Sequence, residues 1–292
     1  MARVRVEGLI QELAASFADA GLAFGHGFES AWDEAVYLVL TVAQLPDDRA
    51  VLSRALDPAA VAQARALAQR RIGERVPLAY LLGQSPYCGA DFLLEPGIVV
   101  PRSPIGSLLL NRLAPWLRAA PRRVLDLCCG SGCIGITAAR VFPGATVDLA
   151  DVDPRAVDLA RRNAERCGVA GRVTAHRSDL LDDLPAGRWD LILCNPPYVD
   201  AADMASLPAE YRHEPALGLA GGADGLDLVA RLLAALPARL ASGGLLVCEV
   251  GASAPALRRR YPHLPCHWPD LPAGGEGVFV LEAAPGGPAA PD

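Results

Sequence analysis

The first third of the chain carries apolar residues at the spacing of amphipathic helices. Between Glu7 and Ala20 the apolar positions recur every three or four residues, at Leu9, Ile10, Leu13 and Phe17. Ser30 can cap a second helix, and Asp57 followed by Pro58 is typical of the start of a further one. No alternating pattern indicates a strand here. We therefore expect a small helical domain over residues 1–83.

The pattern changes between residues 84 and 101. Tyr87 and Phe92 stand among Gly and Pro residues, and the β-branched run of residues 98–100 ends at Pro101. Short apolar runs bounded by turn residues are typical of a hairpin. We expect residues 84–101 to form a β-hairpin that links two domains.

From residue 102 to residue 284, short apolar runs alternate with helical patterns. The expected strands are 124–127, 146–150, 173–176, 190–194, 245–250 and 278–282. Repeated strand–helix units predict an α/β domain with a Rossmann-like, mostly parallel sheet and helices on both faces. The last residues, 285–292, are Pro, Gly and Ala with a terminal Asp, and we expect a disordered tail.

Composition narrows the class of protein. Hydrophobic residues make up 52% of the 292-residue chain, enough for a large core. The formal net charge is -6 and every cationic side chain is Arg, so a general nucleic-acid binder with a basic stripe is disfavoured. We find no signal peptide and no apolar run long enough to span a membrane. The sequence predicts a soluble cytoplasmic protein without a membrane partner.

Cysteine and histidine usage predicts no metal site. The eight cysteines form no Cys-x-x-Cys pair, and most lie in apolar runs, which is typical of buried thiols in a reducing compartment. His263 and His267 flank Cys266, but no paired ligand motif accompanies them.

Four groups of residues follow successive predicted strands, where an open α/β sheet binds its ligand. The first is the loop from Asp126 to Gly132, with Gly130 and Gly132 at its turn. Glycines between a strand and a helix let the backbone approach a ligand closely. An ordinary tight turn would show the same residues.

The second group is Asp151, at the end of the next strand. Its carboxylate could accept two hydrogen bonds from a ribose diol. A helix cap is the competing interpretation, but Asp153 directly before Pro154 fits that cap better. We therefore expect Asp151 to bind a cofactor.

The third group is Asp179 and Leu180, after the third strand. Asp179 could accept a hydrogen bond from an adenine amino group, and Leu180 could cover the ring. Taken alone, the pair could equally be a turn.

The fourth group, Asn195-Pro196-Pro197-Tyr198, is the most specific. Two prolines fix φ and force the preceding residue to be extended. The Asn195 side-chain oxygen and the Pro196 carbonyl then become two fixed acceptors, which match the two N–H donors of a planar NH₂ group. Tyr198 could stack on the same planar group.

Together these residues resemble the class I S-adenosylmethionine-dependent methyltransferases that methylate amino groups and carry an Asn-Pro-Pro-Tyr motif. That group includes adenine methyltransferases of DNA and RNA and the HemK-type protein glutamine methyltransferases. The resemblance implies that Asp126, Cys128, Gly130, Gly132, Asp151, Asp179, Leu180 and Asn195 bind S-adenosylmethionine. Cys128 stands where that loop usually has its first Gly.

The resemblance extends over nearly the whole chain. A helical domain followed by a hairpin matches the glutamine methyltransferases, and it implies that the helical domain selects a protein substrate. Residues 100–106, 24–35 and 203–215 are similar to the branch that methylates a glutamine of ribosomal protein L-three. The release-factor branch typically reads Pro-Arg-Pro-Glu-Thr where this chain has Arg102 and Ser103. Ser107 stands where the family often has Glu.

The resemblance implies in-line methyl transfer to a glutamine amide nitrogen, without a dedicated base. Asn195, Pro196 and Tyr198 would be catalytic, and Pro197 and Arg102 would join them in binding the substrate. The alternatives are a release-factor glutamine methyltransferase, a nucleic-acid adenine methyltransferase and a non-catalytic cofactor-binding protein. The acidic charge and the intact motif count against the last two.

Overall fold

The chain is divided into two compact units. A computed structural model describes residues 4–271 and 276–283, so the expected tail of residues 285–292 lies outside the described residues. Unit 1 comprises Met1–Ser85 together with Pro208–His213, and unit 2 comprises Pro86–Leu207 together with Glu214–Asp292. The division falls inside the first strand, two residues after the expected end of the helical domain. The distant segment 208–213 is an addition that the sequence pattern did not predict.

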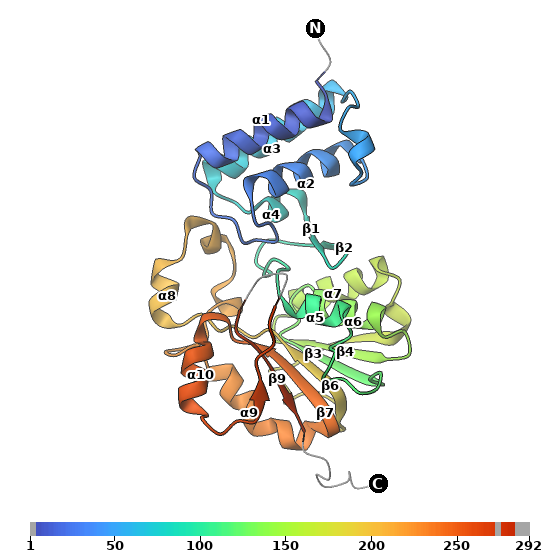
Figure 1. Ribbon diagram of the computed structural model, residues 1–292, viewed down its shortest axis with the longest axis vertical. Coiled ribbons are helices and arrows are strands. Elements are labelled where there is room, and N and C mark those ends of the chain that lie inside the picture. Colours follow the sequence, from blue (N-terminus) through green and yellow to red (C-terminus); the bar gives the residue numbers. More distant parts are fainter. Residues whose placement is uncertain (1–3, 272–275, 284–292) are drawn as a thin grey trace. The chain divides into compact units, whose positions relative to one another are not determined.

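Unit 1 is helical, as the apolar spacing predicted. Its helices are α1 (Val6–Asp19), α2 (Ala31–Ala43), α3 (Pro58–Glu74) and α4 (Leu78–Leu82). The side chain of Ser30 accepts a hydrogen bond from Asp33 N–H, and Asp57 accepts one from Ala59 N–H. Both caps were expected. The buried faces of α1, α2 and α3 share one apolar core (Figure 1).

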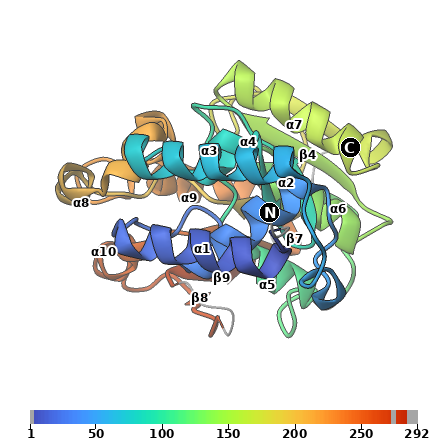
Figure 2. The same ribbon diagram turned by 90° about the horizontal axis from the view of Figure 1, so that it is seen from above.

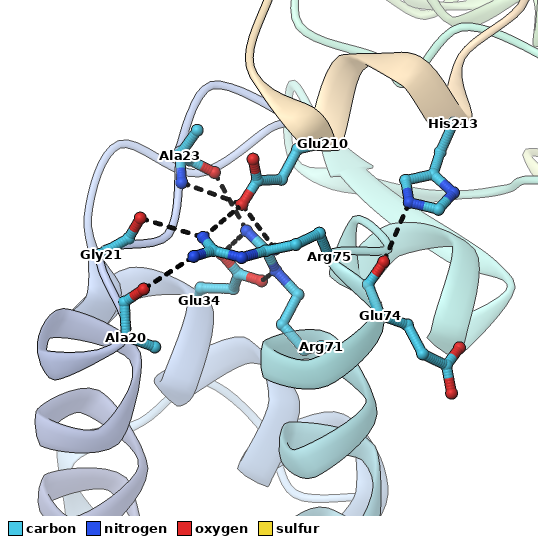
Figure 3. A network of polar contacts seen from close by, with 9 residues as sticks. All are labelled: Ala20, Gly21, Ala23, Glu34, Arg71, Glu74, Arg75, Glu210 and His213. Carbon is cyan, nitrogen blue, oxygen red and sulfur yellow. Dashed lines mark hydrogen bonds and ion pairs between the residues drawn. The ribbon is translucent and has the colours of Figure 1, made fainter.

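The segment 208–213 is held in unit 1 by a buried network of charges (Figure 3). Glu210 Oε1 accepts from Ala23 N–H at 3.0 Å, from Arg75 at 3.1 Å and from Arg71 at 3.3 Å. Arg71 also donates to Glu34 Oε1 at 2.6 Å. Burying charges is costly unless they are paired, so the network fixes this distant segment to α2 and α3.

Unit 2 is built on a seven-stranded sheet in the order β5-β4-β3-β6-β7-β9-β8. The strands are β3 (Arg123–Leu127), β4 (Thr146–Asp151), β5 (Val173–Arg177), β6 (Trp189–Cys194), β7 (Leu240–Glu249), β8 (Cys266–His267) and β9 (Val278–Glu282). The strands β3, β4, β5, β6 and β7 are parallel, and β9 is antiparallel to both of its neighbours. The predicted mostly parallel α/β sheet is confirmed.

Helices cover both faces of this sheet (Figures 1 and 2). They are α5 (Ile105–Leu110), α6 (Cys133–Val141), α7 (Pro154–Arg166), α9 (Asp227–Arg239) and α10 (Ala254–Arg260). The short helix α8 (Ala201–Ser206) has no buried residue. The helices α5, α6 and α7 share an apolar core with one face, and α9 and α10 share another with the opposite face. Successive side chains of a strand point to opposite faces, so each buried strand contributes to both cores.

The expected hairpin is shorter than predicted. It consists of β1 (Gln84–Tyr87) and β2 (Ala90–Leu93), and the β-branched residues 98–100 form no strand. The N–H of Val100 donates to the side chain of Glu214 at 2.9 Å. A backbone donor used by a side chain is not available to a sheet ladder, and strong β propensity alone does not make a strand.

Candidate active site

The predicted ligand-binding loops meet at one edge of the sheet. β3 pairs in parallel with β4 and with β6, so that Leu127 lies opposite Ala150 on one side and Cys194 on the other. The loop after β3, Asp151 and Asn195 therefore emerge side by side at the carboxyl ends of three adjacent strands. After β5 the chain returns to the other side of β3, which makes this edge the switch point where α/β sheets bind ligands.

The loop after β3 has the backbone of a ligand cradle. Cys128, Gly130 and Gly132 adopt φ of 56°, 53° and 79°. This left-handed region favours glycine, which explains why a Gly is usual at the position of Cys128. A Cβ added to Gly135 would lie 2.3 Å from Leu149 Cδ2. Gly135 is therefore a further required glycine, which the sequence analysis missed.

Asp126 lies beneath this loop and is fully buried. Its Oδ2 accepts from Gly135 N–H at 2.8 Å, while its buried Oδ1 has no hydrogen-bond partner among the described residues. Burial raises the pKa of Asp126 to about 7, although the Gly135 N–H opposes the shift. The carboxyl group holds the start of α6, and its predicted contact with the cofactor stays a prediction.

Asp151 joins the loop to the next strand. Its Oδ2 accepts from Gly130 N–H at 2.9 Å and its Oδ1 accepts from Asp153 N–H at 3.0 Å. Asp153 caps α7, as expected, by accepting from Arg155 N–H. Burial raises the pKa of Asp151, and the two backbone donors oppose that shift. Each carboxylate oxygen can accept more than one hydrogen bond, so Asp151 can hold the loop and a diol together.

Asp179 and Leu180 follow β5 at the same edge. Leu180 is buried with φ of 52°. Asp179 is half exposed and accepts from Arg231 of α9 at 3.0 Å. An adenine amino group would share this carboxylate with the guanidinium, so the predicted role of Asp179 stays a prediction.

The Asn-Pro-Pro-Tyr motif begins directly after β6. Pro196 and Pro197 are buried, whereas Asn195 and Tyr198 are partly exposed. The Tyr198 hydroxyl donates to Glu249 Oε1 at 2.7 Å. Ser253 Oγ donates to the Tyr198 carbonyl at 2.9 Å. The motif is therefore anchored at its far end, while its first residue directly follows β6 at the edge where the loop after β3 begins.

Arg102 is already engaged by a carboxylate in unit 2. Its two terminal nitrogens donate to the two oxygens of Glu214 at 2.6 Å and 2.7 Å. Such a bidentate pair is strong and directional. The pair gives Glu214 a structural role, and the binding of substrate by Arg102 stays a prediction. Ser107 stands nearby, where the family often has Glu. Its hydroxyl donates to the Pro104 carbonyl at 2.8 Å.

Three further features limit the chemistry of the site. All eight cysteines are free thiols. No group of three His, Cys, Asp or Glu side chains suited to a metal ion occurs among residues 4–271 and 276–283. Within the same residues, no helix is both long and apolar enough to cross a membrane.

The chain resembles known methyltransferases. The family model "Methyltransferase small domain" matches residues 104–210. The ribosomal protein uL3 glutamine methyltransferase of Bordetella pertussis is 46% identical over 268 residues, covering 90% of this chain and 89% of that protein. Its namesake from Burkholderia pseudomallei is 40% identical over 290 residues, covering 96% and 94%.

Solved structures support the fold. The hMettl16 catalytic domain, solved in complex with MAT2A 3'UTR hairpin 6, has a TM-score of 0.53 and 17% identity, covering 80% of this chain and 84% of that one. The fold, the family model and the two relatives together define a class I methyltransferase. At 46% identity over nine-tenths of its length, the chain belongs to the family of ribosomal protein uL3 glutamine methyltransferases.

Proposed function

We propose that this enzyme transfers a methyl group from S-adenosylmethionine to the side-chain amide nitrogen of a glutamine in ribosomal protein uL3. One observation carries the proposal. The Asn195–Tyr198 motif lies beside the loop after β3 at one edge of the sheet, and the chain is 46% identical to the ribosomal protein uL3 glutamine methyltransferase of Bordetella pertussis. Modification of a ribosomal protein would place the reaction in the cytoplasm.

The residues present fit S-adenosylmethionine. The left-handed backbone at Cys128, Gly130 and Gly132 brings the chain close to a ligand, and a Cβ at Gly132 would lie 3.0 Å from Ala160 Cβ. Asp151 offers remaining acceptor capacity for the ribose hydroxyls. The buried, unpaired Oδ1 of Asp126 adds a negative or polar group beneath the loop. When bound, the cofactor supplies an electrophilic methyl group.

The Asn195 side chain and the Pro196 carbonyl would hold the glutamine amide. An amide nitrogen is a poor nucleophile because its lone pair is delocalised into the carbonyl. Two fixed acceptors on its N–H groups favour the geometry in which the lone pair faces the methyl group, as preorganised dipoles do. Because φ of Pro196 and Pro197 is fixed, little reorganisation is needed at the moment of reaction.

The hydrogen bond of Tyr198 limits its chemical role. Its hydroxyl donates to the buried carboxylate of Glu249, so the hydroxyl is not presented to the acceptor as a free acid. The role we propose for Tyr198 is packing of its ring on the planar amide. The nitrogen becomes strongly acidic once it is methylated and can lose its proton to water, so a dedicated base is not required.

We propose that unit 1 selects the protein substrate. It has its own apolar core, and the segment 208–213, ten residues after Tyr198, is built into it. A glutamine side chain offers little surface for recognition, so affinity for a particular protein needs further contacts. We infer no direct, sequence-specific role for nucleic acid.

One experiment tests the proposed function. The purified enzyme is incubated with labelled S-adenosylmethionine and, separately, with uL3, a peptide release factor and adenine-containing DNA or RNA. Mass mapping should find one added methyl on a glutamine of uL3. Labelling of only the release factor or of adenine would overturn the substrate assignment.

A further inference from the structure

A buried carboxylate is hydrogen-bonded to the last residue of the Asn-Pro-Pro-Tyr motif. Glu249 is the last residue of β7 and is 5% exposed. Its Oε1 accepts from the Tyr198 hydroxyl at 2.7 Å, and its Oε2 accepts from the Ser103 hydroxyl at 2.6 Å. One carboxylate therefore joins the Asn-Pro-Pro-Tyr motif to the segment that precedes α5.

Both hydrogen bonds have the short lengths of O–H donors to a charged acceptor. A carboxylate buried in an apolar strand end costs free energy unless its oxygens are bonded. Burial raises the pKa of Glu249, and the hydroxyls of Ser103 and Tyr198 together with the charge of Arg102 oppose that shift. Ser103, Tyr198 and Arg102 together stabilise the charged form of Glu249. The strength of the hydrogen bond from Tyr198 therefore depends on Ser103, because Ser103 helps to keep the carboxylate charged.

The rest of Tyr198 is confined as tightly as its hydroxyl. Ser253 Oγ donates to the Tyr198 carbonyl at 2.9 Å. A Cβ added to Gly251 would lie 2.5 Å from Tyr198 Cε2, and one added to Gly221 would lie 2.7 Å from Tyr198 Cα. The ring and backbone are therefore packed against glycines, and Glu249 fixes the remaining freedom at the end of the ring.

We propose that Glu249 is a positioning residue for methyl transfer, holding the Tyr198 ring through its hydroxyl while Ser103 holds the carboxylate. The proposal rests on the proposed function, because the Tyr198 ring is the surface on which the acceptor amide packs. A ring that is free to tilt still binds an acceptor but aligns it less often with the methyl group. The contact therefore acts on turnover more than on binding.

The test is a double-mutant cycle on the full-length enzyme with uL3 as acceptor. Tyr198→Phe keeps the ring and removes the donor, and Glu249→Ala removes the acceptor. Each single change should lower kcat about ten- to a hundred-fold, the range of a charged hydrogen bond. The double variant should be no slower than the slower single variant, because both act through one bond.

Two further variants separate positioning from loss of fold. Glu249→Gln keeps an oxygen that can accept from Tyr198, so it should recover most of the kcat that Glu249→Ala loses. Ser103→Ala should lower kcat by a smaller factor. Its matched control is Ser107→Ala, which removes a nearby hydroxyl bonded only to a backbone carbonyl and should leave kcat unchanged. If Glu249→Ala does not fold, Tyr198→Phe, Glu249→Gln and Ser103→Ala still decide the question.

The readouts distinguish this proposal from the proposed function. Cofactor affinity by calorimetry and KM for the acceptor should stay within about three-fold of wild type in every variant. Additive effects in the cycle, an unchanged kcat in Tyr198→Phe, or a change confined to KM would overturn the role of Glu249. If wild type methylates another acceptor and not uL3, the substrate assignment fails, and the same cycle is run on that acceptor.

Discussion

The ion network of unit 1 and the sheet edge of unit 2 hold their buried carboxylates in opposite ways. In unit 1, Glu34 and Glu210 share the guanidinium of Arg71, whose side chain is 1% exposed (Figure 3). In unit 2, Asp126 is bonded to a backbone N–H and Glu249 to two hydroxyls. Unit 1 neutralises buried charge with buried charge. Unit 2 holds Asp126 and Glu249 with neutral dipoles, although its buried Glu214 pairs with the guanidinium of Arg102.

The net pKa shift of each carboxyl group depends on how far its partners offset the effect of burial. Burial would raise the pKa of Glu210, but the Ala23 N–H, Arg75 and Arg71 outweigh it and the net shift is downward. Burial raises the pKa of Glu34 because Arg71 only partly offsets it. In unit 2 burial dominates, and the pKa of Asp126 rises to about 7.

The difference teaches what each arrangement is suited to do. An ion pair with buried arginines satisfies both partners and fixes distant pieces of chain to one another, which suits a scaffold. Neutral donors fix the position of a carboxylate without cancelling its field, which suits the edge of a sheet that has to orient a cationic sulfonium and a polar amide.

The largest effect should come from breaking the ion network of unit 1. Arg71→Met leaves Glu34 and Glu210 buried beside each other, and removing one partner of a buried pair typically costs about 3–5 kcal/mol. Urea unfolding followed by circular dichroism measures the free energy of unfolding. The matched control is Arg70→Met, which breaks an exposed pair with Glu74 and should cost roughly 0.5 kcal/mol. Equal losses in the two variants would refute the contrast.

Removing a fixed dipole at the sheet edge should act on rate and leave stability unchanged. Asn195→Ala deletes one acceptor of the amide hydrogens, and loss of one preorganised group typically lowers kcat about 10²–10³-fold. Stopped-time mass spectrometry of uL3 gives the rate, and calorimetry gives cofactor affinity. Asn195→Asp keeps an acceptor of similar shape and should retain more activity than Asn195→Ala. A wild-type rate in Asn195→Ala would show that the motif does not hold the amide.

A smaller effect is expected at Asp151. Asp151→Ala should weaken S-adenosylmethionine binding by about 1.5–3 kcal/mol, the range of a hydrogen bond to a charged group. Part of that loss of affinity comes from a less ordered loop after β3, because the Gly130 N–H also loses its acceptor. Asp151→Asn keeps one acceptor oxygen and should lose less. Calorimetry that finds unchanged affinity in folded Asp151→Ala would remove this residue from the cofactor site.

Measured per pH unit, the smallest effect is a pH dependence with opposite signs at Asp126 and at Glu210. Asp126 has a folded pKa above its unfolded value, so its contribution to stability is lost as pH rises from about 4 to about 7. Relative to Asp126→Asn, wild type should lose roughly 1 kcal/mol of stability per pH unit in that window. Glu210 has a lowered pKa, so its contribution is lost as pH falls below the ordinary range of a glutamate. Unfolding curves for wild type and Asp126→Asn between pH 4 and pH 8 check the first sign, and a gap independent of pH would contradict it.

Local patterns determined much of this protein. Helical spacing, the caps at Ser30, Asp57 and Asp153, and the alternation of strands and helices all predicted elements that the structure confirms. The positions of the loop after β3 and of the Asn-Pro-Pro-Tyr motif at strand ends could also be predicted, because glycine and proline restrict the backbone within a few residues. The binding roles of their residues stay predictions. The β-branched residues 98–100 were read wrongly as part of a hairpin, since propensity cannot say whether a partner strand is present.

Only the tertiary structure decided which distant residues share a buried environment. Glu210 lies 139 positions from Arg71, and Glu249 lies 146 positions from Ser103. A single Glu at the end of an apolar strand, such as Glu249, indicates that the carboxylate has a hydrogen-bond partner. No sequence pattern predicts which residue that partner is. Burial makes an unpaired polar group costly, and which groups satisfy it is fixed by packing over the whole chain.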